Sequence, residues 1–346
     1  MDVKQTLLEL CALHGAAGDE NEAAEHVARL LQSFGEVMRT PLGSVVCRVW
    51  DAAPGQPHLL LDAHLDEVGM VVTHIDDTGF LRISGCGGVD RRALPACPVT
   101  LYGKKGRMNG VICSTPPHLD SGKEKKFAKV EELYLDIGCT KEQAEALIYP
   151  GARVSLPGTA RLLLEDKICG KALDNRAGCA SLLYALELLR EENPHCGLSV
   201  LFSSMEEVGG QGAKTAAYAL SPTHAVVVDT SFAHTPGAER PKCGLMGKGP
   251  MIGMAPILSS YMTARLMHAA RAQGIAYQSE VMPGKTGTNA DHIATVRAGV
   301  ETGLVSIPLK YMHTPVEMAA ISDVEDTGKL LAAMVKYFAQ EGAGVL

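Results

Sequence analysis

Side chains that can bind metal ions follow four short apolar runs of the chain. The runs span residues 58–61, 198–202, 225–228 and 304–309. Each has the length of a buried strand, and ligands bind beyond the carboxyl ends of strands in open α/β sheets. We therefore expect one crevice to collect the side chains that follow, which are His64, Asp66, Glu206, Glu207, Asp229 and His313. A further carboxylate, Asp174, precedes a predicted helix over residues 177–189 and would join them.

Imidazole and carboxylate groups without thiolates suit Zn²⁺ first, with Co²⁺ or Mn²⁺ as alternatives. The set offers more ligands than the three that a catalytic zinc takes from a protein, so two divalent cations fit better than one. A bridging carboxylate can hold two such ions ~3.5–4 Å apart. Glu206 and Glu207 are adjacent, and neighbours in an extended segment point to opposite faces. One of them should bind metal while the other takes a proton from water.

Each of these segments also has an ordinary structural explanation when it is taken alone. Asp174 could be a helix N-cap, a histidine after a strand could be a hydrogen-bonded loop residue, and Glu206-Glu207 could be a solvated turn. The metal-site hypothesis depends on the joint placement of these groups after the buried strands.

The elements around these residues predict an α/β fold, a mixed sheet flanked by helices. Apolar residues at helical spacing indicate helices over residues 177–189, 212–220, 258–273, 290–297 and 327–340. Strands that alternate with helices indicate a sheet covered on both faces.

The chain between residues 68 and 164 has a different texture from the rest. Glycines and prolines are dense there, and short apolar stretches alternate with turns. This pattern predicts a small β-rich domain, inserted into a catalytic α/β domain that is made of residues 1–67 and 165–346.

Composition and charge argue against several classes of protein. The 346 residues are 46% hydrophobic and 21% charged, which is ordinary for a globular protein. Subtracting 39 acidic from 32 basic residues gives a net charge of −7, which argues against a nucleic-acid partner. Ten cysteines without a Cys-x-x-Cys pair indicate free thiols in a reducing compartment. No signal peptide and no apolar run near the ~20 residues that cross a bilayer are present, so we expect a cytoplasmic protein without a membrane partner.

Five segments around the candidate ligands carry a family resemblance. They are Asp62-Ala-His-Leu-Asp-Glu-Val-Gly, Lys171-Ala-Leu-Asp-Asn-Arg-Ala-Gly, Met205-Glu-Glu-Val-Gly, Val228-Asp229 and Tyr311-Met-His-Thr-Pro-Val-Glu. With them the chain resembles the tetrahedral aminopeptidases, a family of dinuclear metallopeptidases that includes glutamyl and deblocking aminopeptidases. The similarity keeps its order over nearly the whole chain, through Gly87-Gly-Val-Asp-Arg, Gly247-Lys-Gly-Pro-Met and Gly287-Thr.

The resemblance implies a zinc exopeptidase-like fold and the removal of N-terminal residues from peptides by a dinuclear site. It assigns His64 and Asp229 to one cation, Glu207 and His313 to the other, and Asp174 to the bridge between them. Glu206 would be the general base, and Asp66 would orient a ligand or the base. The inserted domain would mediate dimerisation of a homo-oligomer, and the dimers would be the building blocks of a hollow dodecamer.

Some features near the expected cleft leave the substrate preference open. Gly210-Gln211, the Thr-Ser-Phe after Asp229, and Asn289 differ from the residues that the family usually carries at these positions. Lysines in the cleft would favour acidic substrates, whereas lysines elsewhere would be ordinary surface charge; the candidates are Lys248, Lys285 and Lys310.

Two other functions fit parts of the pattern. A glycoside hydrolase of the endoglucanase type needs only two carboxylates, and it would leave His64 and His313 without a role. A catalytically silent assembly protein on the same fold would not need the complete set of groups. Neither Gly-x-Ser-x-Gly nor His-Glu-x-x-His is present, so the sequence lacks the signatures of an α/β-hydrolase and of a thermolysin-type protease.

Overall fold

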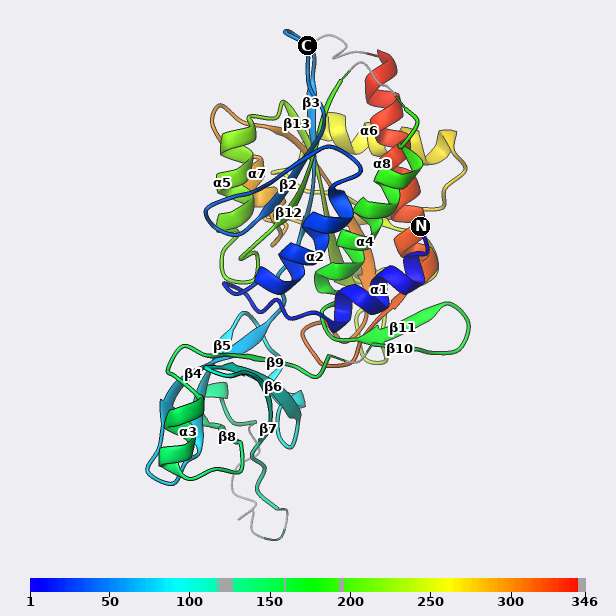
Figure 1. Ribbon diagram of the computed structural model, residues 1–346. Helices are drawn as coiled ribbons and strands as arrows, with labels where there is room; N and C mark the ends of the chain where they lie inside the picture. The colour runs from blue at the N-terminus through cyan, green and yellow to red at the C-terminus, as the bar shows by residue number, and fades with distance from the viewer. Residues whose placement is uncertain (117, 119–126, 159, 193–195, 342–346) are drawn as a thin grey trace.

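The computed structural model describes residues 1–116, 118, 127–158, 160–192 and 196–341. Figure 1 shows a larger α/β part and a smaller β-rich part below it. Strands β4 to β9 form the smaller part, and the chain before and after them forms the larger part. The predicted fold class, a mixed sheet flanked by helices with a small β-rich insertion, is confirmed.

An eight-stranded mixed sheet forms the centre of the larger part. Its order is β1 (Glu36–Arg39), β2 (Val45–Trp50), β12 (Gly197–Ser203), β3 (His58–His64), β13 (His224–Phe232), β16 (Glu301–Leu309), β14 (Met251–Met254) and β15 (Gln278–Val281). The four apolar runs of the sequence become β12, β3, β13 and β16, which lie side by side and parallel. Strands buried on both faces are apolar along their whole length, which explains the runs. Their carboxyl ends therefore meet at one edge of the sheet.

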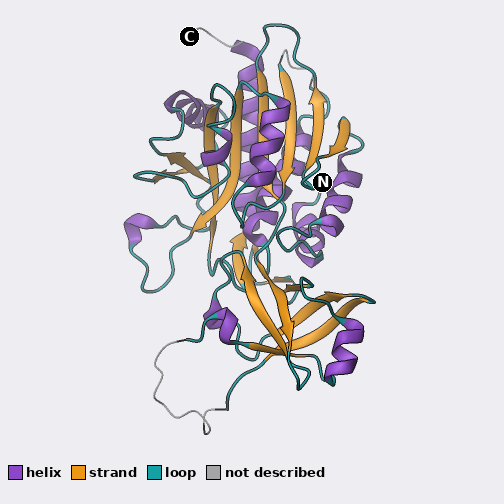
Figure 2. Cartoon of the chain, turned by 90° about the vertical axis from the view of Figure 1, so that its left-hand side faces the viewer, coloured by secondary structure: helices purple, strands orange, loops and turns teal. Residues whose placement is uncertain are grey.

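Helices cover both faces of this sheet, as Figure 2 shows. One face packs into the large hydrophobic core with α1 (Val3–Ala12), α2 (Asn21–Leu31), α4 (Leu173–Leu188), α6 (Ser260–Ala272) and α8 (Ile321–Glu341). The opposite face packs against α5 (Gln211–Leu220) and α7 (Ala290–Ile293). Helix α7 is shorter than predicted, and the left-handed backbone of Arg297, with φ 51°, turns the chain toward β16. No helix of the described chain has the length and apolar character needed to cross a membrane.

The smaller part is a closed barrel with a core of its own. Its strands, in barrel order, are β4 (Gly69–Ile75), β5 (Leu81–Cys86), β8 (Tyr134–Asp136), β7 (Gly106–Ile112), β6 (Pro98–Gly103) and β9 (Arg153–Ser155). A helix, α3 (Lys141–Leu147), and the short 3₁₀ turns η1 (Arg91–Ala93) and η2 (Val130–Glu132) accompany them. Met70, Ile83, Leu101 and Val154 are among its buried residues, which form a hydrophobic cluster separate from those of the larger part. A separate core is what defines a domain.

A small three-stranded sheet connects the segments that carry the candidate ligands Asp174 and His313. It consists of β10 (Arg161–Leu162), β11 (Lys167–Gly170) and β17 (Glu317–Ala320), in that order. Strand β11 leads into α4, and β17 follows the turn after β16. A further 3₁₀ turn, η3 (Arg240–Lys242), lies between β13 and β14.

Candidate active site

The candidate ligands converge beyond the carboxyl ends of the central parallel strands. His64 ends β3, Asp229 lies near the end of β13, and His313 follows β16. Glu206 and Glu207 follow β12, and Asp174 lies at the start of α4. Together they line a cavity of about 320 Å³ whose other walls include Thr230, Ser231, Phe232, Thr286 and Met312. Segments up to 249 residues apart (313 − 64) therefore contribute to one site.

The side chains approach one another at the separations of metal ligands. Nε2 of His64 lies 3.2 Å from Oδ1 of Asp174 and 3.6 Å from Oδ1 of Asp229. Nε2 of His313 lies 3.4 Å from Oδ2 of Asp174 and 3.3 Å from Oε1 of Glu207. Ligands bound at the usual zinc distances in a tetrahedron lie about 3.3–3.5 Å from one another. The two oxygens of Asp174 thus face one histidine each.

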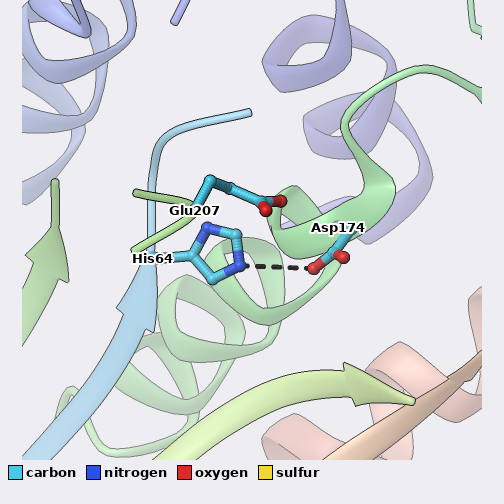
Figure 3. Close-up of side chains that lie close together, drawn as sticks. All are labelled: His64, Asp174 and Glu207. Atoms are coloured by element: carbon cyan, nitrogen blue, oxygen red, sulfur yellow. Dashed lines mark hydrogen bonds and ion pairs between the residues drawn. The ribbon is translucent and has the colours of Figure 1, made fainter. Parts of the chain in front are cut away.

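Figure 3 shows His64, Asp174 and Glu207 pointing toward a common space. One ligand atom from each of these three residues lies within 4.8 Å of the others. Oε1 of Glu207 is buried and accepts no hydrogen bond, although it lies 3.3 Å from the His313 ring. A buried carboxylate oxygen without a donor is costly, and a bound cation would satisfy it. The residues present therefore fit a metal centre.

Both histidine rings are oriented so that Nε2 faces the cavity. Nδ1 of His64 lies 3.1 Å from the backbone oxygen of Asp66, and Nδ1 of His313 lies 2.9 Å from that of Gly88. A carbonyl oxygen only accepts, so each Nδ1 carries the proton and donates it. In the neutral ring, Nε2 is then left with a lone pair for a metal ion.

The site holds more buried negative charge than its histidines balance. Burial raises the pKa of Glu206 to about 9 and also raises the pKa values of Glu207 and Asp229. Burial disfavours the charged form of His313, but the contacts with Asp174 and Glu207 dominate and raise the pKa of its ring to about 11. Divalent cations would supply the positive charge that this set of groups lacks.

Asp66 contacts the loop that carries the adjacent glutamates rather than lining the cavity. It is 0% exposed, and its Oδ1 and Oδ2 accept hydrogen bonds from the backbone N–H groups of Glu206 (3.0 Å) and Glu207 (3.1 Å). Glu20 accepts the preceding one, from Met205, at 3.1 Å. Two buried carboxylates thus hold three consecutive amides of this loop. No pattern in the sequence singles out Glu20 for this role.

A second unforeseen carboxylate, Glu317, lies behind two of the ligands. It is buried and accepts hydrogen bonds from the backbone N–H groups of Asp174 and His313. The only signal in the sequence was its presence four residues after His313 in the segment from Tyr311.

Only some of the residues that left the substrate preference open line the cavity, and Gly210 and Gln211 are not among them. Thr230, Ser231 and Phe232, which follow Asp229, line the cavity. Asn289 is buried and does not line the cavity; its side-chain amide donates to Oδ2 of Asp62 at 3.0 Å and to the Ser203 hydroxyl at 2.8 Å. The three lysines considered for acidic substrates do not line it; they are Lys248, Lys285 and Lys310.

Comparison with known proteins connects this geometry to an enzyme family. The family model for M42 glutamyl aminopeptidase matches residues 43–330. Lysyl aminopeptidase of Pyrococcus furiosus is 30% identical over 308 residues, which cover 87% of this chain and 87% of that protein. The structure of aminopeptidase APDkam598 from Desulfurococcus kamchatkensis has a TM-score of 0.91 and 31% identity, covering 99% of this chain and 98% of that one. The TET1 peptidase of Pyrococcus horikoshii, described as able to assemble into a tetrahedron or a large octahedral shell, has a TM-score of 0.85 and 28% identity, covering 96% and 99%.

Proposed function

The chain belongs to the M42 glutamyl aminopeptidase family and is an aminopeptidase, and we propose that it removes N-terminal residues from peptides with two divalent cations and Glu206 as the general base. The family resemblance read from the sequence is confirmed. The observation that carries the proposal is the carboxylate of Asp174, which lies between His64 and His313 with one oxygen toward each.

The contacts around Asp174 support two cation sites that share this residue. His64 contacts Asp174 and Asp229, whereas His313 contacts Asp174 and Glu207. Each set of three offers one imidazole and two carboxylates, a donor set that suits zinc, cobalt or manganese. We propose that Asp174 bridges the two sites. Zn²⁺ is the first candidate, and Co²⁺ and Mn²⁺ accept the same donors.

When bound, two divalent cations would polarise the scissile carbonyl and lower the pKa of a water molecule toward ~7. Glu206 lines the same cavity but makes none of the histidine contacts that mark the ligands. Its carboxylate is therefore free to accept the proton of the attacking water and pass it to the leaving amine. Asp66 holds the backbone of Glu206 and Glu207, so the base and the neighbouring ligand keep a fixed relation.

The glycoside hydrolase alternative explains fewer of these contacts. Such an enzyme needs two carboxylates at a defined separation, and the two histidines that flank Asp174 would serve no purpose. A silent assembly protein would likewise have no use for the buried oxygen of Glu207 that accepts no hydrogen bond.

The decisive experiment assays the purified protein on aminoacyl anilides and on a β-glucan, with metal content measured in the same sample. We expect anilide cleavage that a chelator abolishes and that Zn²⁺, Co²⁺ or Mn²⁺ restores. Glucan cleavage that survives chelation would favour the glycoside hydrolase. Fully metal-loaded protein that cleaves neither substrate would favour the silent assembly protein. The residues released from a peptide library would define the substrate preference.

We further propose that the chain acts as a homo-oligomer, built from dimers that contact through the barrel and assemble into a dodecamer. The barrel exposes apolar side chains that a partner copy would cover, namely Val111, Phe127, Tyr134 and Tyr149. The Pyrococcus horikoshii TET1 peptidase is described as able to assemble into a tetrahedron or a large octahedral shell, and the similar structure PhTET1-12s is described as a dodecamer. Light scattering would give the mass in solution.

We also propose a cytoplasmic location, because all ten cysteines are free thiols, as expected in a reducing compartment.

A further inference from the structure

Glu317 makes the same kind of contact with two candidate ligands that come from different elements. It is the first residue of β17 and is 1% exposed. Its Oε2 accepts a hydrogen bond from the backbone N–H of Asp174 at 3.0 Å, and its Oε1 accepts one from that of His313 at 2.6 Å. Hydrogen bonds from amides to a carboxylate are charge-assisted and are shorter and stronger than neutral ones.

The two amides belong to chain segments that are 139 residues apart (313 − 174). Asp174 lies at the start of α4 with a non-helical backbone, and His313 lies in the turn between β16 and β17 with φ 65°. A non-glycine residue in the left-handed region is held there by its surroundings. The carboxylate of Glu317 connects both backbones through a single rigid group. On the other side of these backbones, Nε2 of His313 and Oδ2 of Asp174 are 3.4 Å apart.

Strand pairing explains how Glu317 reaches this place. Strand β17 pairs with β11 in antiparallel register, with Glu317 opposite Gly170. Strand β11 leads directly to Asp174, and the turn before β17 carries His313. The small sheet thus places one carboxylate behind both segments.

We infer that Glu317 is a positioning residue that fixes the separation of Asp174 and His313 and thereby sets the affinity of the site for its cations. This inference rests on the proposed dinuclear site. Glu317 acts through the backbones of the two ligands, while its own oxygens are occupied by amides. It corresponds in function to Asp66, which accepts the backbone N–H groups of Glu206 and Glu207.

The test is the substitution Glu317→Gln, which keeps the size of the side chain. One oxygen becomes an NH₂ group, so one backbone N–H faces a donor instead of an acceptor. Loss of an outer partner of a metal ligand typically weakens metal affinity about 10- to 100-fold. We expect a loss of that size in the dissociation constant for Zn²⁺ or Co²⁺, measured by competition with a chromophoric chelator. Glu317→Asp, which keeps both oxygens, should lose less affinity.

Asp323 offers a matched control. It is a buried carboxylate in α8 that accepts hydrogen bonds from the backbone N–H groups of Gly247 (2.7 Å) and Gly249 (2.8 Å), and it does not line the cavity. Asp323→Asn removes the same kind of contact, so it should lower the melting temperature while leaving metal affinity unchanged. Equal metal affinities in Glu317→Gln and the wild type would overturn the inference, as would equal losses in both variants.

The outcome for the inference is separable from the outcome for the proposed function. Wild-type protein that binds two cations but cleaves no peptide would refute the proposed activity, and the affinity comparison would still decide the role of Glu317. Wild-type protein that binds no cation would refute both.

Discussion

The substitution Glu206→Gln tests the division of labour between the two adjacent glutamates. The loop geometry should survive this change, because Asp66 contacts the backbone N–H of Glu206 and not its side chain. The metal ligands should also remain, because the contacts among His64, Asp174, Glu207 and His313 do not involve Glu206. The variant therefore removes the proposed base and little else.

A positioned general base contributes about 10²- to 10⁴-fold to a rate. We expect the kcat of Glu206→Gln to fall by this factor, which corresponds to about 3–5 kcal/mol in the activation free energy. The KM should change far less, because the amide keeps the size and position of the carboxylate. Metal content should equal that of the wild type.

The pH profile gives an independent readout of the same residue. Burial raises the pKa of Glu206 to about 9, and nearby carboxylates act in the same direction. Bound cations lower it, because they favour the charged form. A base must be deprotonated, so wild-type kcat/KM should fall as the pH drops below the pKa that Glu206 has in the metal-loaded enzyme. In the variant that limb of the profile should disappear.

The assay is steady-state hydrolysis of an aminoacyl anilide between pH 5 and pH 10, with metal content measured for each sample. Glu301→Gln is a charge-matched control, because Glu301 is exposed at the start of β16, the end of the strand far from His313. An unchanged kcat in Glu206→Gln, or an unchanged acid limb, would refute the assignment. Loss of metal together with activity would identify Glu206 as a ligand instead.

Three further changes test the framework around the site. Asp66→Asn replaces one of the two oxygens that accept the N–H groups of Glu206 and Glu207. We expect kcat to fall by about 10- to 100-fold, from the ~1.5–3 kcal/mol of a charged hydrogen bond, and a normal kcat would contradict the positioning role. Lys171→Met leaves the 1%-exposed Glu67 without the ammonium group that lies 2.6 Å from its oxygens. The free energy of unfolding, measured by urea denaturation, should therefore fall by about 3–5 kcal/mol. It should recover in part when Glu67→Leu is added. Burial raises the pKa of Asp62 to about 7, so this carboxyl stabilises the fold less as the pH rises from about 4 to 7. In the metal-free protein, the gain in unfolding free energy from Asp62→Asn should be larger at pH 8 than at pH 5 by on the order of 2–4 kcal/mol. An equal effect at both pH values would contradict the raised pKa of Asp62.

The local patterns of the sequence were sufficient to predict the strands and the candidate ligands. Runs such as 225–228 are apolar because a strand covered on both faces has no solvent side, and the structure places them at the centre of the sheet. Residues after such strands collect at one edge, so His64, Asp229 and His313 could be selected together. Their individual roles at a metal centre stay predictions.

Helix ends were less well determined by the sequence. The predicted helix over residues 327–340 begins instead at Ile321, directly after β17, and α7 ends at Ile293. Apolar spacing identifies the buried face of a helix but not where neighbouring elements start or stop it.

Only the tertiary structure assigned partners to the buried carboxylates. Asp66, Glu20 and Glu317 are three of the 39 acidic residues of the chain, and the sequence around them does not show which backbone N–H groups they accept. Each accepts a backbone N–H from a segment about 140 to 185 residues away, and no local pattern encodes that contact. Glu317 also accepts the N–H of His313, four residues before it. Side-chain identity and strand burial are local properties, whereas a hydrogen bond between distant segments exists only once the sheets have brought them within 3 Å or so of each other.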